Sequence, residues 1–259
     1  MILLFNGEVK IMKIKEASIV TARTSSRRLP NKTIMEIKNE VKSIDIVIER
    51  AKKIGYPVIL ATSIDPSDDV FVEIAKQHNI EIFRGSLINK IKRWYDCFKE
   101  YQIEYACIVE ADDIAFDYDL YHHGMMELEK SEFDMIMHPD NIVTGLYLLN
   151  LTKNAIEKLF ALVPNEKINT DVVITKLLQK TKLNVSYLEV EPYAKDKKIR
   201  LTLDYIEDLK FFQELYKNID IVSSGKTIID FCENNKSLVE INFHRHKDFI
   251  ENQKKSVIK

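Results

Sequence analysis

The sequence predicts an α/β fold with a mostly parallel central sheet flanked by helices. From Ala17 onward, short β-branched runs alternate with longer amphipathic stretches, which is the pattern of repeated strand-helix-strand units. The chain has 259 residues, of which 46% are apolar and 30% charged, as in ordinary globular proteins. Only six glycines and six prolines occur, and neither a repeat nor a Pro/Gly linker divides the chain. We therefore expect one compact domain.

Eight short runs rich in branched apolar residues are the predicted strands. They cover residues 17–22, 57–62, 81–84, 105–110, 134–138, 146–149, 185–189 and 200–204. Seven longer segments place apolar residues at helical spacing and are the predicted helices. They cover residues 44–53, 68–78, 90–101, 120–129, 153–162, 171–179 and 206–217.

The two ends of the chain are predicted to lie outside this alternation. Residues 1–16 form an N-terminal extension, in which Asn6-Gly7 is either a hairpin turn or part of a leader that precedes a start at Met12. Residues 17–220 form the main domain. Residues 221–259 form a C-terminal helical appendage, with short elements near 227–232 and 237–241 and a polar end from Asn242 onward.

Composition excludes several classes of protein. With 38 basic and 40 acidic residues, the net charge of −2 argues against a nucleic-acid partner, because such binding needs a surplus of lysine and arginine. No apolar stretch approaches membrane-spanning length, and the N-terminus is a poor signal peptide, so we expect no membrane partner. Three cysteines without a CxxC pair are typical of a reducing compartment, which predicts a cytoplasmic protein.

Ligands of open parallel sheets bind beyond the carboxyl ends of the strands, so the residues that follow each strand are the candidate site. The segment 21–32 follows the first strand and contains Arg23, Arg27, Arg28 and Lys32 among hydroxyl side chains. Guanidinium groups bind phosphate oxygens in pairs, and lysine adds a further positive charge. The segment lacks glycine, which excludes the Walker and dinucleotide loops. An anion-binding loop and a solvated basic loop both stay open.

Two further segments place carboxylates after predicted strands. Asp112 follows the strand 105–110, and oxygen ligands at a strand end suit Mg²⁺, which takes one or two carboxylates and completes its shell with water and phosphate oxygens. Helix capping explains Asp113 or Asp117 equally well. Asp204 ends the strand 200–204, and it is either the cap of the next helix or a second metal ligand.

The three segments, in this order, resemble the cytidylyltransferase family that includes CMP-Kdo synthetases, CMP-acylneuraminate synthetases and spore coat polysaccharide biosynthesis protein F. The family pattern A-R-x-x-S-x-R-L-P-x-K is matched by Ala22, Arg23, Ser26, Arg28, Leu29, Pro30 and Lys32. Residues 61–69, 83–86 and 200–209 match motifs of the protein F branch, and the resemblance extends over about residues 17–244. The family's Gly-Asp-x-Pro reads Ala-Asp-Asp-Ile at 111–114, and an acidic family position is Asn89.

This resemblance implies a Rossmann-like nucleotide-diphosphosugar transferase fold that binds CTP and Mg²⁺ and forms a two-fold homodimer, with residues 134–149 at the dimer contact. It implies that Asp112 and Asp204 hold the metal. Nucleotide-binding positions implied by the family motifs are Ala22, Arg23, Ser26, Arg28, Lys32, Ala61, Thr62, Ser63 and Asp112. Among these, Arg23, Arg28 and Lys32 are the expected catalytic residues, because they match the triphosphate-binding positions.

The expected reaction is transfer of CMP from CTP to a sugar acid or to a sugar or polyol phosphate, with release of pyrophosphate, for surface polysaccharide or glycan synthesis. Lys167 and Asp171 precede the helix that borders the acceptor in the family, and they are the predicted acceptor-binding residues. Three alternatives stay open: a nucleotidyltransferase that uses another nucleoside triphosphate, a metal-dependent glycosyltransferase that uses a nucleotide sugar, and an inactive nucleotide-binding module.

Overall fold

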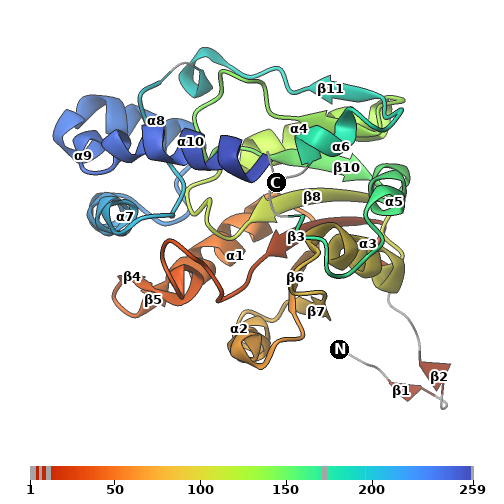
Figure 1. The fold of residues 1–259 in the computed structure, drawn as a ribbon. Coiled ribbons are helices and arrows are strands. Elements are labelled where there is room, and N and C mark those ends of the chain that lie inside the picture. The colour runs from red at the N-terminus through yellow and green to blue at the C-terminus, as the bar shows by residue number, and fades with distance from the viewer. Residues whose placement is uncertain (1–3, 6–7, 10–12, 171–173, 196, 258–259) are drawn as a thin grey trace.

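The computed structural model describes residues 4–5, 8–9, 13–170, 174–195 and 197–257. Its centre is a seven-stranded sheet in the order β11-β9-β10-β8-β3-β6-β7 (Figure 1). The strands are β3 (Glu16–Thr21), β6 (Val58–Ser63), β7 (Glu81–Gly85), β8 (Tyr105–Glu110), β9 (Met135–Met137), β10 (Leu149–Thr152) and β11 (Val185–Tyr187). All neighbouring pairs are parallel except those of β10, which runs antiparallel to β8 and β9. The predicted fold class is confirmed.

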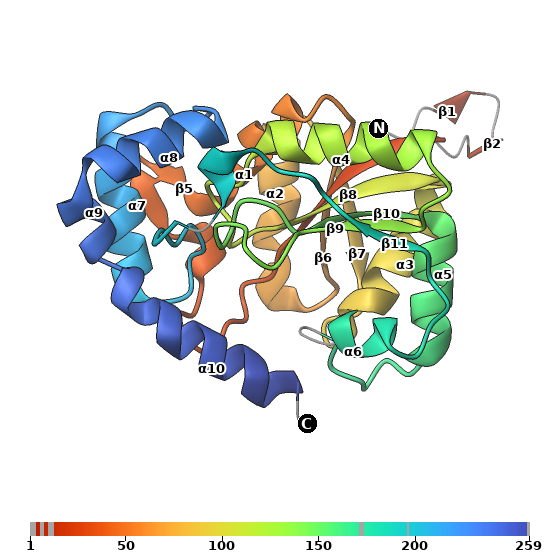
Figure 2. The same cartoon turned by 90° about the horizontal axis from the view of Figure 1, so that it is seen from above.

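Helices cover both faces of the sheet (Figure 2). One face carries α1 (Ser43–Lys53), α2 (Val70–Gln77) and α4 (Tyr118–Lys130), and the other carries α3 (Lys90–Tyr101), α5 (Lys153–Leu162) and α6 (Ile174–Leu178). Strand β3 shows why both faces are covered: Val20 packs with the first group, while Ala17 and Ile19 pack with the second, because successive side chains of a strand point to opposite faces. No helix of the described residues is long and apolar enough to cross a membrane.

The chain beyond the sheet continues with α7 (Ile206–Asn218), α8 (Gly225–Asn234), α9 (Lys236–Glu240) and α10 (His246–Val257). Ile228, Ile229 and Cys232 of α8 are fully buried in the same core cluster as α1 and α4. The division at residues 220 and 221 stays a prediction. Two small antiparallel ribbons complete the fold, β1 (Leu4–Phe5) with β2 (Glu8–Val9) and β4 (Glu36–Lys38) with β5 (Val41–Lys42). The turn predicted at Asn6-Gly7 lies outside the described residues.

The parallel strands end at one level, and this brings the predicted site segments together. Thr21, the last residue of β3, lies opposite Ala61 of β6 and Glu110 of β8, and Ser63 lies opposite Gly85 of β7. The four segments that follow these strands therefore begin side by side at one edge of the sheet. This is the edge at which open α/β sheets bind their ligands.

Two predicted strands were wrong. The run 146–149 is a loop up to Leu149, where β10 begins and continues to Thr152. The run 200–204 is extended but joins the sheet nowhere, and its only ladder contact among the described residues is an isolated bridge between Arg200 and Thr144. An alternating apolar pattern identifies an extended, half-buried segment, but a strand also needs a neighbouring edge with which to pair.

The predicted dimer contact falls partly inside the sheet. Strand β9 is paired on both edges, by β10 and β11, so residues 135–137 offer no edge to a second copy. A contact through the segment 134–149 would involve its side chains or the loop before β10. The homodimer stays a prediction.

Candidate active site

The segment after β3 is folded against the sheet edge rather than solvated along its length. Ala22 donates its backbone N–H to Ala61 O at 3.2 Å, and Asn31 donates to Thr24 O at 3.1 Å, which closes the loop. Asn31 adopts the left-handed conformation, with φ 61°, that turns the chain toward Lys32. Ser43, the first residue of α1, donates its hydroxyl to Lys32 O at 2.7 Å. Lys32 therefore has a fixed backbone at the site.

A buried carboxylate fixes the same loop from the neighbouring segment. Asp68 accepts hydrogen bonds from Thr24 N at 2.7 Å and Thr24 Oγ1 at 2.8 Å through one oxygen, and from Ser63 Oγ at 2.5 Å through the other. Hydrogen bonds to an ionised acceptor are stronger than neutral ones, so this carboxylate joins the end of β6 to the loop after β3.

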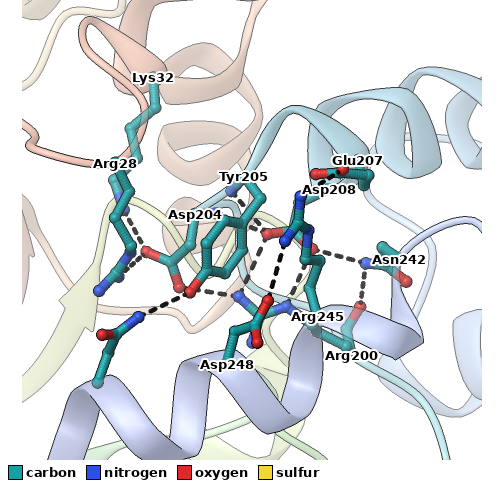
Figure 3. Close-up of polar contacts among 11 residues, drawn as sticks. Arg28, Lys32, Arg200, Asp204, Tyr205, Glu207, Asp208, Asn242, Arg245 and Asp248 are labelled. Carbon is teal, nitrogen blue, oxygen red and sulfur yellow. Dashed lines mark hydrogen bonds and ion pairs between the residues drawn. The ribbon is translucent and has the colours of Figure 1, made fainter.

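The Lys32 ammonium binds two carboxylates that come from distant parts of the chain. Its Nζ donates to Asp112 Oδ2 at 2.5 Å and to Asp204 Oδ1 at 2.9 Å. The side chain is only 11% exposed, and Figure 3 shows its contact with Asp204. Burial acts to lower the pKa of Lys32, but the two carboxylates outweigh it and raise the pKa to about 12. Lys32 is therefore a permanently charged group at this point.

Backbone pairing explains how two carboxylates 92 positions apart meet. Leu203 donates its N–H to Asp112 O at 2.8 Å, so the extended segment that carries Asp204 runs beside the turn after β8. The same segment is also held two residues earlier, where Leu201 donates to Thr144 O at 2.9 Å. The Asp112 side chain is 28% exposed and that of Asp204 only 2%. Asp112 thus faces the solvent-accessible side of the pair.

Asp204 is bound by cations on both oxygens, and the N-cap residue of α7 is Tyr205 rather than Asp204. Oδ1 accepts from Arg28 as well as Lys32, and Oδ2 accepts from Arg200 Nη2 at 2.9 Å (Figure 3). Burial acts to raise the pKa of Asp204, but Lys32 and Arg28 hold that pKa well below its usual range. The start of α7 is capped by Asp208, which accepts from Asp204 N at 2.8 Å and Tyr205 N at 2.9 Å. In contrast, Asp117 does cap α4, by accepting from Asp119 N.

Sequence reasoning missed the buried arginine beneath Asp204. Arg200 is fully buried, and besides Asp204 it binds Asp208, with Nε 2.9 Å from Oδ1. Asn242 completes this layer, because its amide donates to Asp208 Oδ1 at 2.9 Å and to Arg200 O at 3.1 Å. The matched stretch 200–209 contains Arg200 and Asp208. Arginine is mostly exposed in proteins, so the sequence alone gives no sign that Arg200 is buried.

The other predicted nucleotide-binding residues lie along the same edge. Arg23 donates to Leu87 O, in the loop after β7, at 3.3 Å. Ser26 accepts from Leu29 N at 3.5 Å. Ala61, Thr62 and Ser63 form the fully buried end of β6.

The predicted acceptor residues are less well placed. Lys167 lines a cavity of about 350 Å³ together with Ile64 and the loop Gly85–Ile88, so it lies beside the segments that follow β6 and β7. Asp171 lies outside the described residues. Asn89, which replaces an acidic residue of the family, caps α3 by accepting from Lys92 N, and its amide donates to Val163 O at 2.7 Å. Asn89 therefore has a structural role.

The donors present suit a magnesium ion. The described residues contain no group of three or more His, Cys, Asp or Glu side chains arranged around one point. They do contain Asp112 and Asp204, which already share one cation, and Mg²⁺ is commonly bound by one or two carboxylates with substrate phosphates and water. The pair fits an ion that binds together with a phosphorylated substrate.

Comparison with known proteins agrees with this geometry. The family model of cytidylyltransferases matches residues 17–228. Uncharacterized protein MJ1063 of Methanocaldococcus jannaschii is 31% identical over 243 residues, which are 92% of this chain and 99% of that protein. Among solved structures, a cytidylyltransferase from Leptospira borgpetersenii is similar with a TM-score of 0.75 and 21% identity, over 88% of this chain and 97% of the other.

A more distant structure shares the fold. A CMP:2-keto-3-deoxy-manno-octonic acid synthetase complexed with CTP is similar with a TM-score of 0.59 and 13% identity, over 79% of this chain and 99% of the other. The family model covers the cationic loop, both carboxylates and the parallel core of the sheet. This chain belongs to the cytidylyltransferase family and is a nucleotidyltransferase.

Proposed function

We propose that this enzyme is a Mg²⁺-dependent cytidylyltransferase that transfers CMP from CTP to a sugar acid or to a sugar or polyol phosphate. The observation that supports it best is the ion-paired cluster of Lys32, Asp112 and Asp204 at the carboxyl edge of the sheet, next to Arg28. A cationic loop for the triphosphate and a carboxylate pair for a divalent ion are the two components that nucleotidyl transfer needs.

In the proposed reaction, an oxygen of the acceptor attacks the α-phosphorus of CTP. A new bond forms between that oxygen and phosphorus, the bond from the α-phosphorus to the bridging oxygen breaks, and pyrophosphate leaves. When the acceptor is a hydroxyl, its proton passes to solvent. Arg23, Arg28 and Lys32 stabilise the charge that grows on the leaving pyrophosphate, because guanidinium and ammonium groups bind phosphate oxygens. The carboxylates Asp112 and Asp204 hold Mg²⁺, which lowers the repulsion between the phosphates and an approaching anion.

Two acceptor classes fit this proposal. A 2-keto sugar acid would attack through its anomeric hydroxyl and give a CMP-sugar. One structure with the same fold is named as a CMP:2-keto-3-deoxy-manno-octonic acid synthetase. A sugar or polyol phosphate attacks through a phosphate oxygen and gives a CDP conjugate. We assign Lys167 to the acceptor side, because it lines the cavity beside β6 and β7 and supplies a cation to an anionic acceptor.

The proposal includes a cytoplasmic homodimer that supplies an activated sugar to surface polysaccharide or glycan assembly. Cys97, Cys107 and Cys232 are all buried and free, as expected for a reducing compartment.

A pyrophosphate-release assay tests the proposal. Each of the four nucleoside triphosphates is supplied with Mg²⁺ and a panel of 2-keto sugar acids, sugar phosphates and polyol phosphates. Release with CTP and one acceptor class is expected, and preference for another triphosphate would refute the base assignment. Cleavage of a nucleotide sugar without use of any triphosphate would identify a glycosyltransferase instead.

Variants then assign the residues. Asp112→Asn and Asp204→Asn are expected to lower kcat at least a hundredfold, because each removes a carboxylate that holds the ion. Asp230→Asn is the matched control, since Asp230 is an exposed carboxylate paired with Lys226 on α8. Turnover of either site variant at the rate of the control would contradict the metal assignment.

A further inference from the structure

We propose that Lys32 is an internal counter-ion that occupies the metal position between Asp112 and Asp204 until a divalent cation displaces it. This inference rests on the proposed function, because it takes these two carboxylates as the metal ligands. It adds an exchange of partners: the ammonium that leaves the carboxylates becomes the group that binds the triphosphate.

The geometry of the carboxylates carries the argument. A metal ion held by both side chains would bind at least one oxygen of each, and the oxygens that share a common partner are Asp112 Oδ2 and Asp204 Oδ1. Those two oxygens are the ones that bind the Lys32 ammonium, at 2.5 and 2.9 Å. The second oxygen of Asp204 is already bound to Arg200, at 2.9 Å in a fully buried pair. Lys32 and a bridging ion therefore compete for the same ligand atoms.

Charge makes the competition exclusive. An ammonium and a divalent cation that share one oxygen of Asp204 repel each other strongly, because that carboxylate is only 2% exposed and solvent screens the two charges little. The Lys32 side chain is 11% exposed, and its backbone is fixed by Ser43 and by the turn at Asn31. Because the backbone is fixed, the exchange moves only the side chain of Lys32. The ammonium leaves the carboxylates while the loop stays in place.

The exchange couples the two ligands of the proposed reaction. The metal alone must displace an ammonium that then has no anion to bind, so its affinity is low without nucleotide. A triphosphate offers oxygens to that ammonium and lowers the cost of displacing it, so metal and nucleotide strengthen each other's binding. The enzyme would thus avoid holding a metal ion in the absence of substrate.

A second buried lysine provides a matched comparison. Lys90, the first residue of α3, lies 2.5 Å from Glu110 Oε1, and its side chain is 10% exposed. It is as enclosed as Lys32 and belongs to the same edge of the sheet, and its ion pair is with Glu110, the last residue of β8.

Titration with Mn²⁺ alone, followed by the electron paramagnetic resonance signal of the free ion, tests the exchange. Lys32→Gln is expected to bind Mn²⁺ at least tenfold more tightly than the wild-type enzyme, because the competing charge is gone. Lys90→Gln is expected to bind it as the wild type does. Equal affinity of Lys32→Gln and wild type, with both folded by circular dichroism, would overturn the inference, as would an equal gain in Lys90→Gln.

A measurement on the wild-type enzyme covers the case in which Lys32→Gln does not fold. Acylation of lysines, followed by mass spectrometry, is expected to modify Lys32 at least threefold faster when Mn²⁺ is added, with no change at Lys90. An unchanged rate at Lys32 at a saturating concentration of Mn²⁺ would overturn the exchange. These readouts need no turnover: an inactive enzyme that shows them refutes only the proposed function, and an active enzyme without them refutes only the exchange.

Discussion

Replacement of Arg200 by methionine tests how the site is supported. Arg200 is fully buried and binds Asp204 and Asp208, each at 2.9 Å. Methionine has a similar length but no charge, so the variant leaves Asp208 without its guanidinium and removes one of the cations that compensate Asp204. Removing one partner of a buried ion pair costs about 3–5 kcal/mol of unfolding free energy. For a chain of this size, that corresponds to a melting temperature about 6–20 °C lower.

Arg245→Met is the matched control for this experiment. Arg245 also binds two carboxylates, Glu207 at 2.8 Å and Asp248 at 2.9 Å, but its side chain is 35% exposed. Solvent screens exposed pairs and they contribute little to stability, so we expect a melting temperature close to that of the wild type. Arg200→Lys should fall between the two, because one ammonium keeps the charge but cannot bind both carboxylates as a planar guanidinium does.

Urea denaturation followed by circular dichroism, together with thermal melting, measures these differences. The reasoning is refuted if Arg200→Met unfolds within about 1 kcal/mol of the wild type, or if Arg245→Met loses as much stability as Arg200→Met. The first result would mean that the carboxylates repack or become protonated at little cost, and the second that burial does not separate the two arginines.

Two further predictions concern other parts of the fold. His78 binds Asp45 and Glu49, each at 2.9 Å, and these carboxylates raise its pKa above the ordinary value near 6.5. The stabilisation by charged His78 is therefore complete below about pH 6.5 and is lost as the pH rises through the raised pKa. The urea midpoint of the wild type should fall over this pH range, and that fall should be absent in His78→Gln. A Cβ at Gly145 would lie 2.4 Å from Leu201 O at a φ of +90°, so Gly145→Ala should cost about 1–3 kcal/mol in urea denaturation, and an unchanged midpoint would contradict the close approach.

The parallel half of the sheet and most helices were predictable from the sequence because their signals are local. Residues 105–110, 90–101 and 153–162 were predicted with the observed bounds, since each is an uninterrupted strand or helix pattern. The segment 200–204 was not, because its apolar alternation is the same whether or not an adjacent strand is available.

The candidate site shows the same division between local and tertiary information. Lys32, Asp112 and Asp204 were all identified from the sequence, through strand-end position and family motifs. Their mutual contacts were not, because Asp112 and Asp204 meet through tertiary contacts such as the hydrogen bond from Leu203 N to Asp112 O. The role of Arg200 likewise depends on burial that only the folded chain defines.

The charges of six ion-paired side chains at the site balance before any ligand binds, and this constrains how a nucleotide can enter the cluster. Three cations, Arg28, Lys32 and Arg200, are paired with three carboxylates, those of Asp112, Asp204 and Asp208. A triphosphate that enters this cluster meets cations that are already compensated, so attraction to its phosphates is weak until the carboxylates bind something else. Under the proposed exchange, a divalent cation at the carboxylates would release Arg28 and Lys32 for the phosphates. The net charge of −2 does not reveal such a site, because each cation of the cluster is offset by a carboxylate. The cluster would attract an anion only after its carboxylates have bound another cation.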